Sequence, residues 1–136
     1  MIETVEQVLK LARKRFIDSV VRYYPWHKDN HTTERNLSFQ FANAFLELHK
    51  SGIAFMEVPF SIVKDGPNSN HLDVYLQGAD FELMLECKNI YAPSHLSGIR
   101  DDINRINPNL VNQLWHRHKN EVKSHGVVLA ETWYPH

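Results

Sequence analysis

Asp73, Glu86 and Lys88 are charged residues set in two short apolar segments in the middle of the chain. Side chains two residues apart in a strand share a face, about 7 Å apart along it, so Glu86 and Lys88 are expected to project together. If the two segments pair as a hairpin, Asp73 lies on that side too. Two carboxylates on an apolar surface repel each other, and a hard divalent cation such as Mg²⁺ or Mn²⁺ would relieve that repulsion.

Both segments alternate in the manner of half-buried strands. One face of residues 71–77 is expected to carry Leu72, Val74 and Leu76, and the other Asp73, Tyr75 and Gln77. One face of residues 81–89 is expected to carry Phe81, Leu83, Leu85 and Cys87, and the other Glu82, Met84, Glu86 and Lys88. The intervening Gln77-Gly78-Ala79-Asp80 predicts a tight turn, so the two segments should form a hairpin.

Asp73, twelve intervening residues and then Glu86-Cys87-Lys88 resemble the signature of the PD-(D/E)xK phosphodiesterase superfamily, the restriction-endonuclease-like nucleases. Leu72 stands where that signature usually has a proline. The resemblance implies an endodeoxyribonuclease-like enzyme that hydrolyses phosphodiester bonds, with DNA as the expected substrate. Mg²⁺ is the implied cofactor, with Mn²⁺ as a substitute.

The resemblance also implies roles for individual residues. Asp73 and Glu86, with the main-chain carbonyl of Cys87, would hold the metal, and Lys88 would orient the attacking water and offset charge on phosphorus. In the resembled family the helix before the strands often carries a glutamate that faces the metal. Glu34 fits this role better than Gln40 or Glu47, although an acid in the first turn also simply favours a helix.

Three further residues are candidates for contact with the substrate. Asn89 directly follows the lysine, and Arg100 opens a stretch to His125 in which basic residues outnumber acids. Gln113, followed by Leu114, faintly resembles a Gln-Leu pair of exonuclease-type members. A solvated helix face would have much the same composition as this stretch.

The elements that position these residues follow from periodicity and capping. Helices are expected from Glu3 to about Tyr24 and from Thr32 or Thr33 to Gly52, and a strand over 53–63 whose Pro59 indicates an edge or a bulge. After the hairpin, a helix should begin at Ser97 or Gly98 with Ile99, Ile103 and Ile106. Pro108 should kink it or divide it from a second helix carrying Leu110, Leu114 and Val122, before a buried strand over 126–133.

This order resembles the αβββαβ core of the same superfamily, an α/β fold with a small mixed sheet flanked by helices. The core would span 32–133, and residues 1–31 would add an N-terminal helix and loop. A length of 136 residues indicates a single domain, 1–136. We expect a homodimer, because cutting two strands requires two sites.

Composition limits the location and the partners. The single cysteine excludes an internal disulfide framework, no apolar run reaches membrane-spanning length, and the first residues do not predict a signal peptide. The expected location is therefore cytoplasmic, without a membrane partner. With a net charge of −1, any phosphate-binding surface must be local.

Other interpretations stay open. Asp73, Glu86 and Lys88 could form a structural ion pair, and the domain could be an inactive nuclease-fold subunit that binds nucleic acid or mediates assembly. The substrate could be RNA. A zinc site at His116 and His118 is disfavoured because on a helix they point about 200° apart. Cys87 is expected on the apolar face, as an inert core residue rather than a nucleophile.

Overall fold

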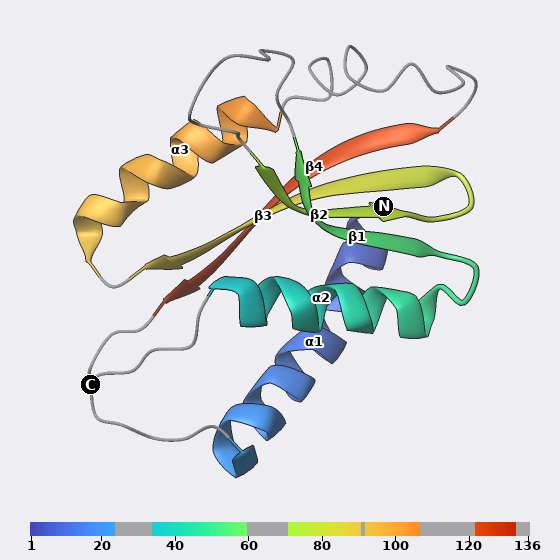
Figure 1. Ribbon diagram of the computed structural model, residues 1–136, viewed down its shortest axis with the longest axis horizontal. Coiled ribbons are helices and arrows are strands. Elements are labelled where there is room, and N and C mark those ends of the chain that lie inside the picture. Colours follow the sequence, from blue (N-terminus) through green and yellow to red (C-terminus); the bar gives the residue numbers. More distant parts are fainter. Residues whose placement is uncertain (24–33, 60–70, 91, 107–121, 133–136) are drawn as a thin grey trace.

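The computed structural model describes residues 1–23, 34–59, 71–90, 92–106 and 122–132. Its helices are α1 (Ile2–Tyr23), α2 (Glu34–Leu48) and α3 (Leu96–Arg105), and its strands are β1 (Ile53–Pro59), β2 (His71–Gln77), β3 (Phe81–Ile90) and β4 (Lys123–Thr132). A short 3-10 helix, Pro93–His95, leads into α3 (Figure 1). The described elements follow the order expected from the sequence: helix, helix, three strands, helix, strand.

The strands form one mixed sheet in the order β1-β2-β3-β4. β1 pairs antiparallel with β2, β2 pairs antiparallel with β3, and β3 pairs parallel with β4. The last pair requires the chain to cross from one end of the sheet to the other, and α3 lies in this connection. The predicted α/β class, a small mixed sheet flanked by helices, is confirmed.

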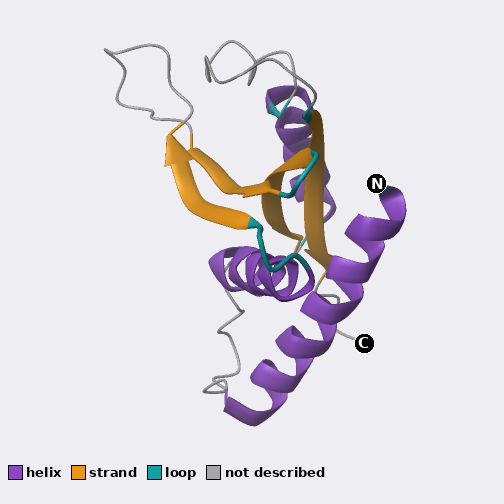
Figure 2. Cartoon of the chain, turned by 90° about the vertical axis from the view of Figure 1, so that its right-hand side faces the viewer, coloured by secondary structure: helices purple, strands orange, loops and turns teal. Residues whose placement is uncertain are grey.

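The main core lies between the sheet and the α1–α2 pair. α1 and α2 lie together on one side of the sheet, and α3 lies on the other (Figures 1 and 2). α1 buries Val8 and Ala12, and α2 buries Phe41 and Phe45. The strands contribute Val74, Leu76, Phe81, Leu83, Leu85 and Cys87 to the same cluster. Every apolar residue predicted for the inner face of β3 is therefore in this core.

A smaller core faces α3, and it contains one residue that the sequence placed on the wrong face. Tyr75 and Met84 meet Ile106 there, as the alternation predicts, but Leu72 joins them instead of Val74 and Leu76. The regular alternation of β2 is broken at this end of the strand. The opposite strand β1 has a non-glycine residue with positive φ, Glu57 at 52°, and the β1–β2 pairing skips it. The register is the same on both sides of Glu57, and the residue opposite it, Asp73, is the point at which the alternation of β2 changes.

Several predicted boundaries are close to those observed. The bounds of α1 and of both hairpin strands match to within one residue, and Pro59 ends β1 at an edge of the sheet. β4 starts three residues earlier than predicted. The helical assignment of Val122 is wrong, because this residue directly precedes β4 and has no helical conformation. Thr32, Thr33 and residues 107–121, including the predicted second helix, lie outside the described residues.

The packing of α3 on the sheet gives a test of the fold. A Cβ added to Gly126 would lie 2.9 Å from the main-chain oxygen of Ile106, whereas one added to Gly98 meets nothing within 4 Å. Gly126→Ala should therefore destabilise the protein by about 1–3 kcal/mol, because main chain must move. The control Gly98→Ala, within α3, should stabilise it by about 0.5–1 kcal/mol. Urea unfolding followed by circular dichroism measures both, and equal effects would contradict this packing.

Candidate functional site

The candidate site forms where β2 separates from β3. Their pairing extends from Gln77↔Glu82 to Val74↔Leu85 and stops there, although β3 continues to Ile90 and stays paired with β4 throughout. Successive N–H groups of a strand point to opposite edges, so those of Cys87 and Asn89 point to the same edge. That edge is the one β2 has left. Both N–H groups therefore need acceptors from elsewhere, because a buried unpaired donor is costly.

Two carboxylates supply these acceptors. The N–H of Cys87 donates to Oδ2 of Asp73 at 2.6 Å, and the N–H of Asn89 donates to Oε1 of Glu34 at 2.9 Å. Asp73 lies in β2 just past the last pair with β3, and Glu34 is the first residue of α2. Hydrogen bonds from N–H groups to a charged acceptor are shorter and stronger than neutral ones. Two of the predicted site residues are thus fixed against the strand that carries the other two.

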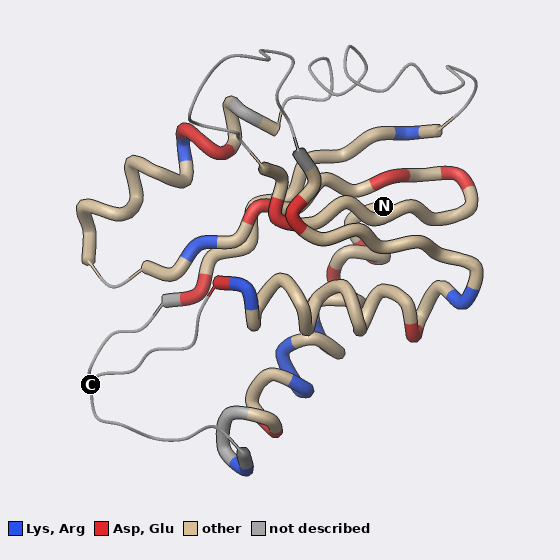
Figure 3. The backbone as a smooth tube through the Cα atoms, viewed as in Figure 1, with Lys and Arg blue, Asp and Glu red and all other residues tan. Residues whose placement is uncertain are grey.

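Glu86 and Lys88 lie on the face of β3 that is turned toward α3. Met84, two residues before Glu86, packs in the smaller core, and Lys88 contacts α3 directly. Glu86 is 2% exposed. Acidic positions of neighbouring strands gather near the middle of the sheet (Figure 3). Asp73 and Glu34 therefore contact the main chain of the β3 segment from 86 to 89, and the side chains of Glu86 and Lys88 project from that same segment.

The carboxyl group of Asp73 is partly buried and lies near other negative charges. Burial raises the pKa of its carboxyl group, the hydrogen bond from Cys87 opposes this, and the charges of Glu57 and Glu34 raise the pKa further. The charge of Lys88 lowers it by a smaller amount. The ionised form of Asp73 is thus disfavoured despite two compensating contacts. An added positive charge near it would relieve this, which is the condition for a cation site.

Cys87 behaves as the sequence predicts. Its side chain is fully buried in the main core. Burial, together with the negative charges of Asp73, Glu86 and Glu34, raises the pKa of its thiol far above the usual range. A thiol that does not ionise is a poor nucleophile, so the hypothesis of a Cys/His nucleophilic site loses its chemical basis.

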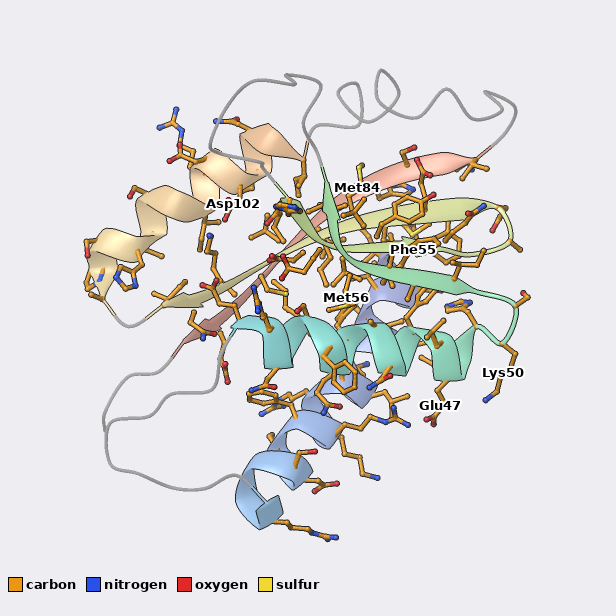
Figure 4. The ribbon with its side chains drawn as sticks, in the orientation of Figure 1. Glu47, Lys50, Phe55, Met56, Met84 and Asp102 are labelled. Atoms are coloured by element: carbon orange, nitrogen blue, oxygen red, sulfur yellow. The ribbon has the colours of Figure 1, made fainter. Side chains whose placement is uncertain are left out.

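Lys88 has a partner that the sequence analysis missed. Its Nζ lies 3.4 Å from Oδ2 of Asp102 in α3. Asp102 is 4% exposed and lies on the side of α3 toward the sheet (Figure 4). A signal for it exists in the sequence, because Asp102 follows Ile99 by three residues and precedes Ile106 by four. This spacing puts an acid in the stripe of the helix that packs against the sheet.

Glu57 is the second residue that the sequence analysis missed. Its charge acts on Asp73, and its Oε1 lies 3.2 Å from Nε of Arg35, beside Glu34. Glu57 has a positive φ. It occupies the position of β1, opposite Asp73, that the β1–β2 pairing skips. Pro59, two residues on, was the only sequence signal for such an irregularity. An acid near the end of an edge strand gives no other indication of a role.

The remaining predicted residues are less informative. Asn89 is 5% exposed and contributes its main-chain N–H to the site. Arg100 lies on the exposed surface of α3. Gln113, His116 and His118 lie outside the described residues. Glu82, on the same face of β3 as Glu86, instead accepts hydrogen bonds from the hydroxyls of Tyr75 and Ser124, so it ties β2, β3 and β4 together.

The residues predicted to bind metal offer only oxygen donors. These are the carboxylates of Asp73 and Glu86 and the main-chain carbonyl of Cys87, and oxygen is the donor type that Mg²⁺ and Mn²⁺ prefer. No three His, Cys, Asp or Glu side chains among the described residues form a group that could enclose an ion. Mg²⁺ commonly binds through one or two carboxylates, with waters and substrate phosphates completing its coordination, so this donor set fits it.

Comparison with known proteins gives no independent identification. No family model, curated protein or solved structure matches the chain. None of the described helices combines the length and the apolar character needed to cross a membrane.

The raised pKa of Asp73 predicts a cost in stability at neutral pH. A carboxyl group whose pKa is raised by folding favours the folded state below its ordinary pKa of 3.8, and this contribution is lost as the pH rises through the folded value. Asp73→Asn, which keeps an acceptor for Cys87, should therefore unfold with a free energy up to about 1 kcal/mol higher than wild type at pH 7, the charge being partly solvated. Urea unfolding at pH 7 and pH 4 measures this.

The gain should shrink at pH 4, where the wild-type carboxyl group is increasingly protonated. Asp80→Asn, at an exposed turn position, is the control and should shift stability little at either pH. A loss of stability in Asp73→Asn at pH 7 would show that the ionised carboxylate stabilises the fold.

Proposed function

We propose that this protein is a metal-dependent nuclease that hydrolyses phosphodiester bonds, with DNA as the substrate. One observation carries the proposal. Asp73 and Glu34 are bound to the main chain of the same β3 segment that presents Glu86 and Lys88. Residues of β2, β3 and α2 thus meet at the main chain of this segment, which supports the proposed assignment of the site. The element order and strand pairings support the αβββαβ core as the finer description of the fold.

In the proposed mechanism each residue has one task. Asp73 and Glu86, with the carbonyl of Cys87, would hold Mg²⁺, and Glu34 would add negative charge for a second ion or its waters. When bound, the metal supplies Lewis-acid chemistry that polarises the phosphoryl group and lowers the pKa of water. Lys88 donates a hydrogen bond to the attacking water, orients it toward phosphorus, and offsets the negative charge that develops there.

Two features of the chain extend the proposal to its partners. A net charge of −1 requires that contact with DNA be confined to a local surface, and the exposed Arg100 of α3 is a candidate contact. Cleavage of both strands of a duplex requires two sites, so the proposal includes a homodimer. The proposed location is the cytoplasm.

A second candidate function is an inactive subunit of the same fold that binds nucleic acid or mediates assembly. The ion pair between Lys88 and Asp102 favours it, because a lysine bound to a buried acid can serve packing alone. The two functions differ in one measurable property, hydrolysis in the presence of Mg²⁺ or Mn²⁺.

The proposal predicts metal-dependent cleavage by the purified protein. Plasmid, single-stranded DNA, branched DNA and RNA should be incubated with Mg²⁺ or Mn²⁺, and the products resolved on gels. Glu86→Gln and Lys88→Met should each lower the cleavage rate by about 10²–10³-fold, because each removes a charge that stabilises the transition state. Asp80→Asn, an acid in the exposed turn before the same strand, should cleave at the wild-type rate.

Two outcomes would contradict the proposal that the protein is a nuclease. Inertness of the folded wild-type protein on all four substrates would leave the inactive subunit, which nucleic-acid binding without cleavage would support. Activity that survives Glu86→Gln would mean that a contaminant or another site cleaves the substrate.

Metal binding also predicts a change in thermal stability that does not depend on a substrate. At a concentration of Mn²⁺ ten times its Kd, the folded state should gain about 1.4 kcal/mol, since only the folded chain assembles the donors. The melting temperature should rise in wild type and in Asp80→Asn. It should rise much less in Asp73→Asn and Glu86→Gln. Equal shifts in all four proteins would place the bound ion elsewhere.

A further inference from the structure

We infer that Asp102 is a positioning residue that fixes the ammonium of Lys88 for the proposed reaction. This inference deepens the proposed function and depends on it, since Lys88 matters to catalysis only if the site hydrolyses phosphodiesters. Asp102 comes from α3, the helix on the far side of the sheet from α1 and α2. The ammonium of Lys88 would thus be positioned by α3 on one side of the sheet, whereas α2 on the other side contributes Glu34 to the same β3 segment.

The geometry shows why the pair constrains the lysine rather than the acid. The side chain of Asp102 is 5% exposed, and that of Lys88 is 32% exposed. The acid is held by its place in the packed stripe of α3, where Ile106 four residues later is also buried. The side chain of Lys88 is a flexible four-carbon stem whose ammonium reaches the surface. An immobile acid at 3.4 Å therefore selects among the rotamers of a mobile amine.

The selection has a chemical consequence. A lysine side chain has about 2 kcal/mol of rotamer entropy, which a free surface lysine would have to lose in reaching the transition state, where it orients the water and offsets the developing charge. With Asp102 in place, much of this ordering is complete before the substrate binds. The ammonium also stays on the face of β3 that carries Glu86, two residues earlier on the same strand. The contribution of Asp102 should therefore lie in turnover rather than in binding.

The ion pair is not the sole contact between this part of the chain and the sheet. Ile106, which directly follows α3, lies in the smaller core with Tyr75, Met84 and Leu72. A buried ion pair is in any case weak evidence for stability, because the cost of desolvating both charges offsets their attraction. A role in orientation accounts for the acid at this position more directly than a role in stability.

The test combines a double-mutant cycle with a separation of binding from turnover. Asp102→Asn keeps the size of the side chain and removes its charge. It should lower kcat on the best DNA substrate by roughly 10- to 100-fold while KM changes less than about twofold, because a misplaced group costs rate rather than affinity. In a Lys88→Met background the same change should have no further effect on the residual rate.

Asp101→Asn is the matched control. Asp101 is the preceding residue of α3 and is exposed, so the variant removes the same charge from the same helix without touching Lys88. It should keep the wild-type kcat. Circular dichroism and melting of every variant establish that the fold is retained. If Asp102→Asn does not fold, Asp102→Ser is used, and the comparison with and without Lys88→Met is repeated.

The outcomes separate this inference from the proposed function. Active wild type with an unaffected Asp102→Asn overturns the inference alone. So does a rate loss of the same factor with and without Lys88→Met, because Asp102 would then act independently of the lysine. A rise in kcat would show that Asp102 withholds the lysine from the substrate, again contradicting a positioning role. An inert wild type removes the proposed function, and the positioning role with it.

Discussion

Two main-chain N–H groups at one edge of β3 are the constraint on which the rest of the site depends. Strand β3 is longer than the part that β2 covers, so beyond Leu85 its edge must be satisfied by something other than a strand. Asp73 and Glu34 satisfy it with their carboxylates. The need for backbone hydrogen bonds thus brings two acids from different elements to the same few residues. The placement of these two side chains is a consequence of how the sheet ends.

This arrangement links the proposed function to a loss of stability. The carboxylate that closes the edge of β3 at Cys87 is also partly buried and lies near the charges of Glu57 and Glu34. A neutral acceptor would complete the backbone equally well with less repulsion. A charged group at such a position is typical of sites that bind a cation or act on a phosphate, because the ligand supplies the missing charge. Under the proposed function, the metal ion would supply this charge.

The sequence predicts much of this fold for identifiable physical reasons. Alternation locates both hairpin strands, and the spacing of Val8, Ala12 and Phe16 locates α1, because these patterns follow directly from which side chains are buried. The facing of Leu72 differs from the prediction because the alternation of β2 changes next to it, opposite the positive φ of Glu57, and no sequence pattern indicates that change. Strand alternation predicts that Asp73, Glu86 and Lys88 lie on neighbouring strands, and the pairing of β2 with β3 confirms this. The pairing of Asp102 with Lys88 and the effect of Glu57 on Asp73 could not be predicted, because only the tertiary structure brings α3 and β1 to these residues.

The two main-chain hydrogen bonds at the edge of β3 also limit which residues of the site could change during evolution. Asp73 and Glu34 hold main chain as well as charge, whereas Glu86 and Lys88 project from a strand whose pairing with β4 needs neither side chain. Substitution of Glu86 would leave the hydrogen bonds of the β3 main chain intact, whereas substitution of Lys88 would remove the cation that pairs with the buried Asp102. Asp73 and Glu34 could be replaced without loss of these hydrogen bonds only by residues that still offer an acceptor, such as amides. A protein of this fold that had lost catalysis would therefore still have oxygen acceptors at these two positions.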